Sequence, residues 1–110
     1  MKLLTPGKAK LLKIYVGETE KFGNTSLYHA ILLKLKENGL AGVTVSRGVE
    51  SYGAANRIRT TRILDLSADL PMIIEAIDTS ENIEKVLPEI SAMVKKGLVI
   101  TFDVDVIKQG

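Results

Sequence analysis

The segment from Arg47 to Arg62, RGVESYGAANRIRTTR, concentrates the side chains with the clearest chemical potential. Every arginine of the chain lies in it: Arg47, Arg57, Arg59 and Arg62. Arginine side chains and the backbone N–H groups of glycines, here Gly48 and Gly53, bind oxyanions such as phosphate. No hydrophobic period runs through these sixteen residues, so we predict a long functional loop without regular secondary structure. A solvated surface loop without a ligand is the alternative.

Four strands and two helices are expected to position this loop. Alternation of apolar and polar residues predicts strands over 9–16, 42–46, 72–77 and 98–107, and residues 63–66 are expected to return toward the sheet. Helical spacing predicts one helix capped by Asn24 or Thr25 and ending at Gly39, and a second helix that begins at a Ser80 cap. The second helix is expected to be kinked but continuous through Pro88, to carry Lys95 and Lys96 in its last turn, and to end at Gly97.

This order of elements predicts an α+β fold, the ferredoxin-like βαββαβ arrangement. Both helices should lie on one face of an antiparallel sheet, with the long loop between the second and third strands. On the open face we place a mixed polar surface in which Lys13 can meet Asp103 or Asp105 across the first and fourth strands. The other residues placed there are Leu11, Tyr15, Thr44, Ser46, Val99 and Thr101. Either solvent or another subunit could cover this face.

Length and composition indicate a single domain over residues 1–110. Of these residues 45% are hydrophobic, which is enough to build a core. The chain has no cysteine, so disulfides, thiolate zinc sites and cysteine nucleophiles are excluded. The apolar runs are too short to span a bilayer and the N-terminus lacks a signal-peptide pattern, so we expect a cytoplasmic protein without membrane insertion. Abundant Ile, Val, Lys and Glu favour a thermophilic source.

Neither an enzyme nor a nucleic-acid-binding protein is favoured. His29 is the only histidine, the acids are scattered, and no metal-ligand or nucleophile pattern occurs, so we predict no catalytic residue and no metal. A net charge of +2 is too small for a typical nucleic-acid-binding domain, and Tyr15 is the one aromatic expected on the open face. An acyl-phosphatase is disfavoured because it would need an arginine in the turn over residues 17–24, which has none. A Walker loop is ruled out because Ala54 and Ala55 replace its lysine and its hydroxyl residue.

An anion-binding site is the chemistry that the residues favour. Arg47 and Arg57 supply cations and Gly48 and Gly53 supply backbone donors. Lys96 and Gly97, at the end of the second helix, are expected to lie near the same strand ends. Together these groups predict a site for a small anion, with a nucleotide phosphate as the first candidate. Tyr52 either stacks on a base or packs the loop onto the domain.

The sequence also resembles the PII signal-transduction proteins. Residues 39–53, GLAGVTVSRGVESYG, resemble the segment in which a helix ends, a G-x-T-V strand follows and a turn opens the T-loop, and Phe102, Asp103 and Val104 match an F-D-V. The G-V-T-V-x-R-G pattern and the S-x-D-L-P of residues 67–71, followed by Ile74 and Glu75, look most like the PII-like family called domain of unknown function 190. The likeness covers nearly the whole chain.

The resemblance implies a cyclic homotrimer with its sheets turned inward and adenine nucleotides bound between subunits at the base of a T-loop-like segment, residues 47–62. Matching positions place Gly42, Val43 and Thr44 around the base, and Tyr52 and Gly53 in the turn of the T-loop. Lys96 and Gly97 match the loop before the last strand, and Lys108 lies near its basic end. Ser51 replaces the first glycine of the turn, and K-K-G-L replaces G-D-G-K, which favours AMP or ADP over ATP.

The sequence therefore predicts a non-enzymatic regulatory trimer with an adenine nucleotide as ligand and no obligatory cofactor. A flexible loop with Arg57, Arg59 and Arg62 would be presented to an unknown protein partner. A membrane transporter or channel is one candidate for this partner. Three alternatives stay open: a structural or partner-binding trimer without a small ligand, a nucleic-acid-binding module, and a small hydrolase acting on a phosphorylated metabolite.

Overall fold

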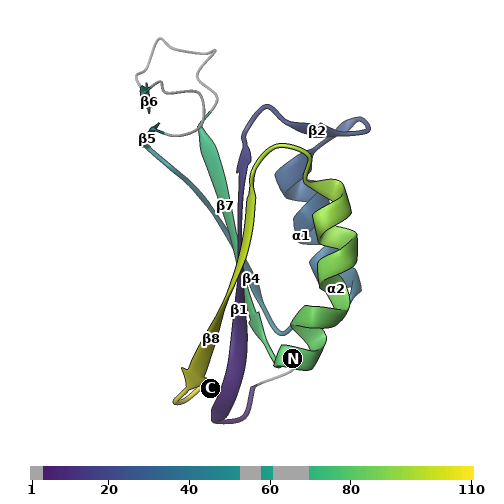
Figure 1. Ribbon diagram of the computed structural model, residues 1–110, viewed down its shortest axis with the longest axis vertical. Helices are drawn as coiled ribbons and strands as arrows, with labels where there is room; N and C mark the ends of the chain where they lie inside the picture. Colours follow the sequence, from purple (N-terminus) through teal and green to yellow (C-terminus); the bar gives the residue numbers. More distant parts are fainter. Residues whose placement is uncertain (1–3, 53–57, 61–69) are drawn as a thin grey trace.

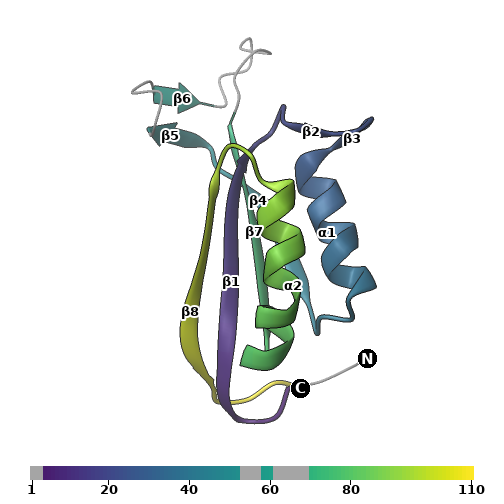
Figure 2. The same cartoon turned by 45° about the vertical axis from the view of Figure 1, so that its right-hand side comes forward.

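The protein consists of a twisted antiparallel sheet with two helices on one face, as the computed structural model shows (Figures 1 and 2). The model describes residues 4–52, 58–60 and 70–110. The four strands of the sheet lie in the order β4-β7-β1-β8. Their bounds are β1 Gly7–Gly17, β4 Val43–Arg47, β7 Pro71–Asp78 and β8 Leu98–Val106, and the helices are α1 Leu27–Glu37 and α2 Ser80–Met93. The predicted ferredoxin-like fold is confirmed.

The core lies between the sheet and the helices. Alternate residues of the two central strands are buried there: Leu12, Ile14 and Val16 of β1, and Met72, Ile74 and Ala76 of β7. The helices meet them with residues at helical spacing, Leu27, Ile31 and Leu35 of α1 and Ile83, Val86, Ile90 and Met93 of α2. The apolar residues that recur every second residue in the strands and every 3.6 residues in the helices thus form one hydrophobic layer.

The helix ends differ in part from the prediction. Gly39 follows the C-cap residue Asn38 with φ of 75°, the left-handed geometry expected of it. The N-cap of α1 is Ser26, not Asn24 or Thr25, and both Thr25 and Ser26 pair in a short hairpin that leads into the helix. The N-cap of α2 is Thr79 rather than Ser80, and its Oγ1 accepts a hydrogen bond from the backbone N–H of Asn82 at 3.2 Å.

The C-terminus of α2 is also earlier than predicted. The helix runs without interruption through Pro88, as expected, but ends at Met93, where Val94 turns into extended backbone. Lys95 and Lys96 therefore lie outside the last helical turn. Gly97 has φ of 145°, and a Cβ added there would lie 2.3 Å from the carbonyl oxygen of Tyr15. Glycine is required at this position because the chain crosses close to β1.

Two short hairpins replace stretches that were predicted to lack regular structure. β2 Lys21–Phe22 pairs with β3 Thr25–Ser26 in the turn after β1. β5 Glu50–Tyr52 pairs with β6 Ile58–Thr60 inside the arginine-bearing segment, so the expectation of a loop without secondary structure is wrong for these residues. Gly53, Arg57, Arg62 and the expected return over residues 63–66 lie outside the described residues.

The two faces of the last strand are the reverse of those predicted. Thr101 pairs with Leu12 and Val99 with Ile14, so the row of β8 that contains Val99, Thr101, Asp103 and Asp105 lies on the helix side. Lys13 is opposite Ile100, and the ion pairs are instead Lys10–Asp103 at 3.7 Å and Lys8–Asp105 at 3.6 Å. Polar residues are tolerated on this side because β8 is an edge strand whose Thr101, Asp103 and Asp105 remain exposed beside the helices.

Candidate functional site

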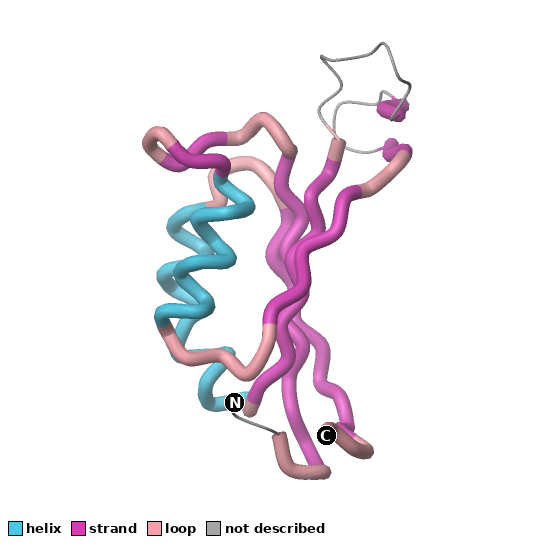
Figure 3. The backbone as a smooth tube through the Cα atoms, turned by 180° about the vertical axis from the view of Figure 1, so that it is seen from behind, coloured by secondary structure: helices cyan, strands magenta, loops and turns pink. Residues whose placement is uncertain are grey.

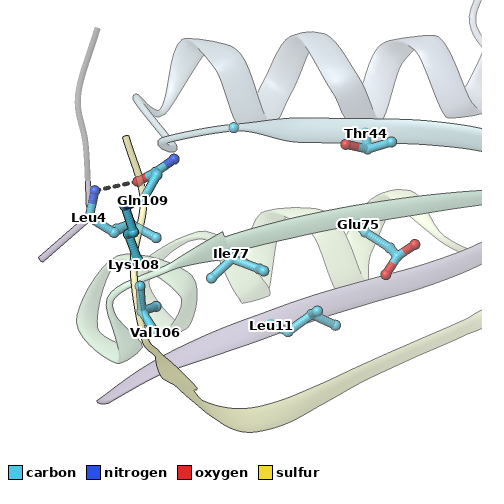
Figure 4. Close-up of a pocket in the computed structure, with 9 residues that line it drawn as sticks. Leu4, Leu11, Thr44, Glu75, Ile77, Val106, Lys108 and Gln109 are labelled. Carbon is cyan, nitrogen blue, oxygen red and sulfur yellow. Dashed lines mark hydrogen bonds between the residues drawn. The ribbon is translucent and has the colours of Figure 1, made fainter. Parts of the chain in front are cut away.

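A pocket of about 400 Å³ opens on the sheet face that the helices leave uncovered (Figure 4). Its lining includes Leu4 near the start of the described chain and Gln109 next to the C-terminus. Figure 3 shows that the C-terminus lies at the end of the sheet away from the β5–β6 hairpin. The walls of the pocket are formed by Leu4, Leu11, Gly42, Thr44, Glu75, Ile77, Val106, Lys108 and Gln109. Three of the predicted nucleotide-binding residues, Gly42, Thr44 and Lys108, are among them.

The register of the sheet explains why these side chains share one face. Thr44 of β4 is opposite Glu75 of β7, and Ile77 of β7 is opposite Leu11 of β1. Residues directly opposite in an antiparallel pair point to the same side of the sheet. The two ends of the described chain complete the wall, where the N–H of Leu4 donates to Oε1 of Gln109 (Figure 4). An apolar floor with a few polar groups is typical of small-molecule sites.

Gly42 occupies the rim of the pocket and leaves space there. A Cβ added to Gly42 would have no neighbour within 4 Å, and its backbone does not have a positive φ. Neither packing nor conformation within the described part of the chain therefore requires glycine at this position, in contrast to Gly97. The space beside Gly42 is accessible to a ligand.

The loop that carries Gly42 is held by the buried carboxylate of Asp78. Its Oδ2 accepts a hydrogen bond from the N–H of Ala41 at 2.8 Å. Its Oδ1 accepts bonds from the N–H of Thr79 at 2.7 Å and from Nδ2 of Asn82 at 2.9 Å. Asp78 thus joins the end of β7, the start of α2 and the residue before Gly42. Sequence reasoning missed it because a lone Asp at the end of a strand gives no signal of burial.

Other predicted anion ligands lie at the opposite end of the sheet. Nη2 of Arg47 donates to Oε1 of Glu18 at 2.9 Å. The N–H of Gly48 donates to the carbonyl oxygen of Pro71 at 2.8 Å, so it is not free to bind a phosphate in this conformation. A Cβ at Gly48 would also lie 2.6 Å from Cγ of Pro71, which explains the glycine by packing.

One subunit alone does not bring the predicted residues together in the part of the chain that is described. Val43 and Val45 pack against the core, so Val43 gives the pocket no side chain, and Arg47, two residues further along β4, points to the helix side as well. Lys96 and Gly97 precede β8 at the Arg47 end of the sheet. For Tyr52 and Arg59 the structure gives only the backbone of β5 and β6.

Six pocket residues were not predicted: Leu4, Leu11, Glu75, Ile77, Val106 and Gln109. The alternation of β7 could have indicated Glu75 and Ile77, since both are out of phase with the buried Ile74 and Ala76. Leu4 and Gln109 lie outside the strands, and only the folded chain brings them together. Tertiary contact was therefore needed to find the terminal wall of the pocket.

The open face around the pocket is largely apolar. Its exposed members include Leu98 (51% exposed), Phe102 (47%) and Ile77 (38%). Lys13 and Tyr15 lie among them, with Nζ of Lys13 located 5.5 Å from the centroid of the Tyr15 ring. Several exposed apolar side chains on one face are characteristic of interaction sites.

Within the described residues, no group of three or more His, Cys, Asp or Glu side chains could hold a metal ion. The helices described here are too short and too polar to cross a membrane.

Comparison with known proteins identifies relatives of the whole domain. The model of the DUF190 family, described as uncharacterized ACR, matches residues 9–106. A UPF0166 protein of Methanocaldococcus jannaschii is 42% identical over 102 residues, covering 92% of this chain and 94% of the relative. A UPF0166 protein of Aquifex aeolicus is 39% identical over 100 residues, with 91% and 94% covered.

A solved structure shows the same fold at lower identity. It is CPII from Thiomonas intermedia K12, a nitrogen regulatory PII-like protein bound to ADP, AMP and bicarbonate. The TM-score is 0.70 at 17% identity, with 96% of this chain and 94% of that chain covered. Because the family model matches nearly the whole domain, the chain belongs to the DUF190 family, and its fold is that of the PII-like protein CPII.

Proposed function

We propose that this protein is a non-enzymatic PII-like regulator that binds an adenine nucleotide between the subunits of a homotrimer. AMP or ADP is favoured over ATP, and the T-loop-like segment 47–62, with Arg57, Arg59 and Arg62, acts on a protein partner. The observation that carries the proposal is the pocket on the open sheet face, in which Gly42, Thr44 and Lys108 lie together. CPII, which shares the fold, binds ADP and AMP.

The pocket suits a nucleobase. Leu11, Ile77 and Val106 supply apolar contact surface, and Thr44 and Glu75 supply polar groups at one side of it. Lys108 supplies a cation for the phosphate or ribose side of the ligand. A volume of about 400 Å³ is within the range of small-molecule sites. The base would lie against Gly42, where a side chain is missing.

In the proposed homotrimer, a neighbouring subunit would supply the predicted site residues that lie far from the pocket. Arg47, Lys96 and Gly97 lie at the other end of the sheet from the pocket, so they can meet the same ligand if a neighbouring subunit contributes them. The apolar open face supports such an assembly, since Leu98 and Phe102 are half exposed in a single chain. Gly48 would contribute shape rather than its N–H, which is donated to Pro71. Roles for Tyr52 and Gly53 remain predictions from the resemblance.

Ligand-dependent thermal unfolding tests the proposal. A ligand that binds the native state stabilises it, by about 2.7 kcal/mol at a concentration one hundred times Kd. We expect AMP and ADP to raise Tm more than ATP does, and native mass spectrometry to show a trimer with nucleotide bound. A trimer with no shift for any of the three nucleotides would instead favour the partner-binding trimer without a small ligand.

Gly42→Val provides a variant specific to the pocket. Because a Cβ at Gly42 meets no atom within 4 Å, the ligand-free variant should unfold at nearly the same temperature as the wild type. Its side chain would occupy the space proposed for the base, so we expect the nucleotide-induced Tm shift to fall to near zero. A full shift in the variant would place the ligand elsewhere.

A further inference from the structure

Arg47 is paired with an acid of its own chain. It is the last residue of β4, and its Nη2 donates to Oε1 of Glu18, which follows the last residue of β1, at 2.9 Å. The two side chains are 47% and 31% exposed. Water and solutes therefore have access to a guanidinium group that is already paired with a carboxylate.

Glu18 also contacts the residue that immediately precedes β7. Its backbone N–H donates to the carbonyl oxygen of Leu70 at 2.9 Å, immediately before β7 begins. Next to it, the N–H of Gly48 donates to the carbonyl oxygen of Pro71 at 2.8 Å. Glu18 thus joins the last residue of β4, through its side chain, to the residue before β7, through its backbone.

We propose that Glu18 is a specificity-determining residue that competes with the phosphate of the bound nucleotide for Arg47. This inference rests on the proposed function, in which Arg47 meets the phosphate. An exposed ion pair contributes little to stability, so its exchange for a better acceptor costs little. A phosphate group offers several oxygens and can accept two parallel bonds from one guanidinium group.

Glu18 opposes an anion whether or not it is displaced. Arginine has five N–H donors, so a phosphate can also bind while the bond to Glu18 persists. In that case the carboxylate and the phosphate lie close together and repel each other. Ligands with enough negative charge overcome this opposition, and uncharged ligands gain nothing from Arg47. Glu18 therefore sets a minimum charge for recruitment of Arg47.

Displacement of Glu18 from Arg47 would also change the contacts of the segment that starts at Gly48. The side-chain link between Arg47 and the turn after β1 is lost, while the backbone bonds of Glu18 to Leu70 and of Gly48 to Pro71 can remain. The charge of the ligand would then alter the contacts at the base of this segment by breaking one ion pair. The Arg47–Glu18 contact can be formed or broken, and the ligand binds these two states with different affinity. That difference is what allows a ligand to shift a conformational equilibrium.

Isothermal titration calorimetry of the full-length protein with adenosine, AMP and ADP tests the inference. Glu18→Gln keeps the shape of the side chain and removes its charge. We expect it to bind AMP and ADP about two- to fivefold more tightly than the wild type, the range that corresponds to an exposed ion pair, and adenosine equally well. Glu20→Gln removes the same charge two residues further along the turn and should leave all three affinities nearly unchanged.

An Arg47→Ala background makes the test specific. If Glu18 acts through Arg47, Glu18→Gln should no longer alter AMP affinity once Arg47 is removed, because the double-mutant cycle isolates their coupling. Unchanged or weaker AMP binding by Glu18→Gln in the wild-type background would overturn the inference while leaving nucleotide binding intact. If the wild type binds none of the three ligands, the proposed function fails and the inference fails with it.

Discussion

At the scale of single residues, Asp78 is the most consequential side chain that sequence reasoning missed. It is fully buried, and its carboxylate accepts bonds from the N–H groups of Ala41 and Thr79 and from Asn82. A buried carboxylate persists only where hydrogen bonds compensate its lost hydration. Here the compensation links the pocket rim to the start of α2, so one residue supports both the fold and the candidate site.

Asp78→Ala should therefore lower the free energy of unfolding by about 3 kcal/mol, since the part-buried N–H groups of Ala41 and Thr79 and Nδ2 of Asn82 lose their acceptor. Urea denaturation followed by circular dichroism measures this change. Asp105→Ala is the matched control, because Asp105 forms an exposed ion pair with Lys8 and the loss of such a pair should have little effect. Equal losses in the two variants would contradict the structural role of Asp78.

At the scale of elements, the connection from α2 to β8 depends on a close approach at Gly97. Gly7 and Gly97 have similar backbone geometry, with φ of 131° and 145°. A Cβ at Gly7 would meet nothing within 4 Å, whereas a Cβ at Gly97 would lie 2.3 Å from the carbonyl oxygen of Tyr15. This pair separates the conformational cost of losing glycine from the steric cost of a clash.

Gly97→Ala should be more destabilising than Gly7→Ala. Both variants pay for an unfavourable φ, on the order of 1–3 kcal/mol, but only Gly97→Ala also forces β8 away from β1. Thermal unfolding of the ligand-free variants gives the comparison. If the two Tm values fall equally, the contact with Tyr15 is relaxed without cost, and the glycine reflects backbone conformation alone.

At the scale of the whole molecule, the open sheet face is the surface through which we propose that copies of the chain meet. Leu98, Ile100, Phe102, Val104 and Val106 of β8 lie on this face, and the polar row of the same strand lies on the other. In a single chain Phe102 is 47% exposed. Burying such a surface against a second copy gains roughly 25 cal/mol for each square ångström of apolar area removed from water.

Phe102→Asp should dissociate the proposed homotrimer, because it places a charge on the face that would be buried. Thr101→Asp is the matched control, since Thr101 is the neighbouring residue on the helix side and is already exposed. Light scattering after gel filtration measures the mass of each variant. A wild-type mass for Phe102→Asp would mean that the open face is not the interface between subunits.

The sequence by itself determined the order of the two helices and of the four strands of the main sheet, most of the core and the family resemblance. Strong periods of two and 3.6 residues in stretches such as Leu12 to Val16 and Ile83 to Met93 allow only one secondary structure each. Gly39 was likewise predictable, because it ends a helix in the geometry that glycine favours.

Only the tertiary structure decided which face of β8 is open, why Gly48 and Gly97 are glycines, and that Arg47 is paired with Glu18. A period of two divides a strand into two rows, but which row is covered depends on the neighbouring strand and the helices above it. Contacts between residues far apart in the chain, such as Leu4 with Gln109 and Ala41 with Asp78, have no local signature. The pocket is built from such contacts, so it became visible only in the folded chain.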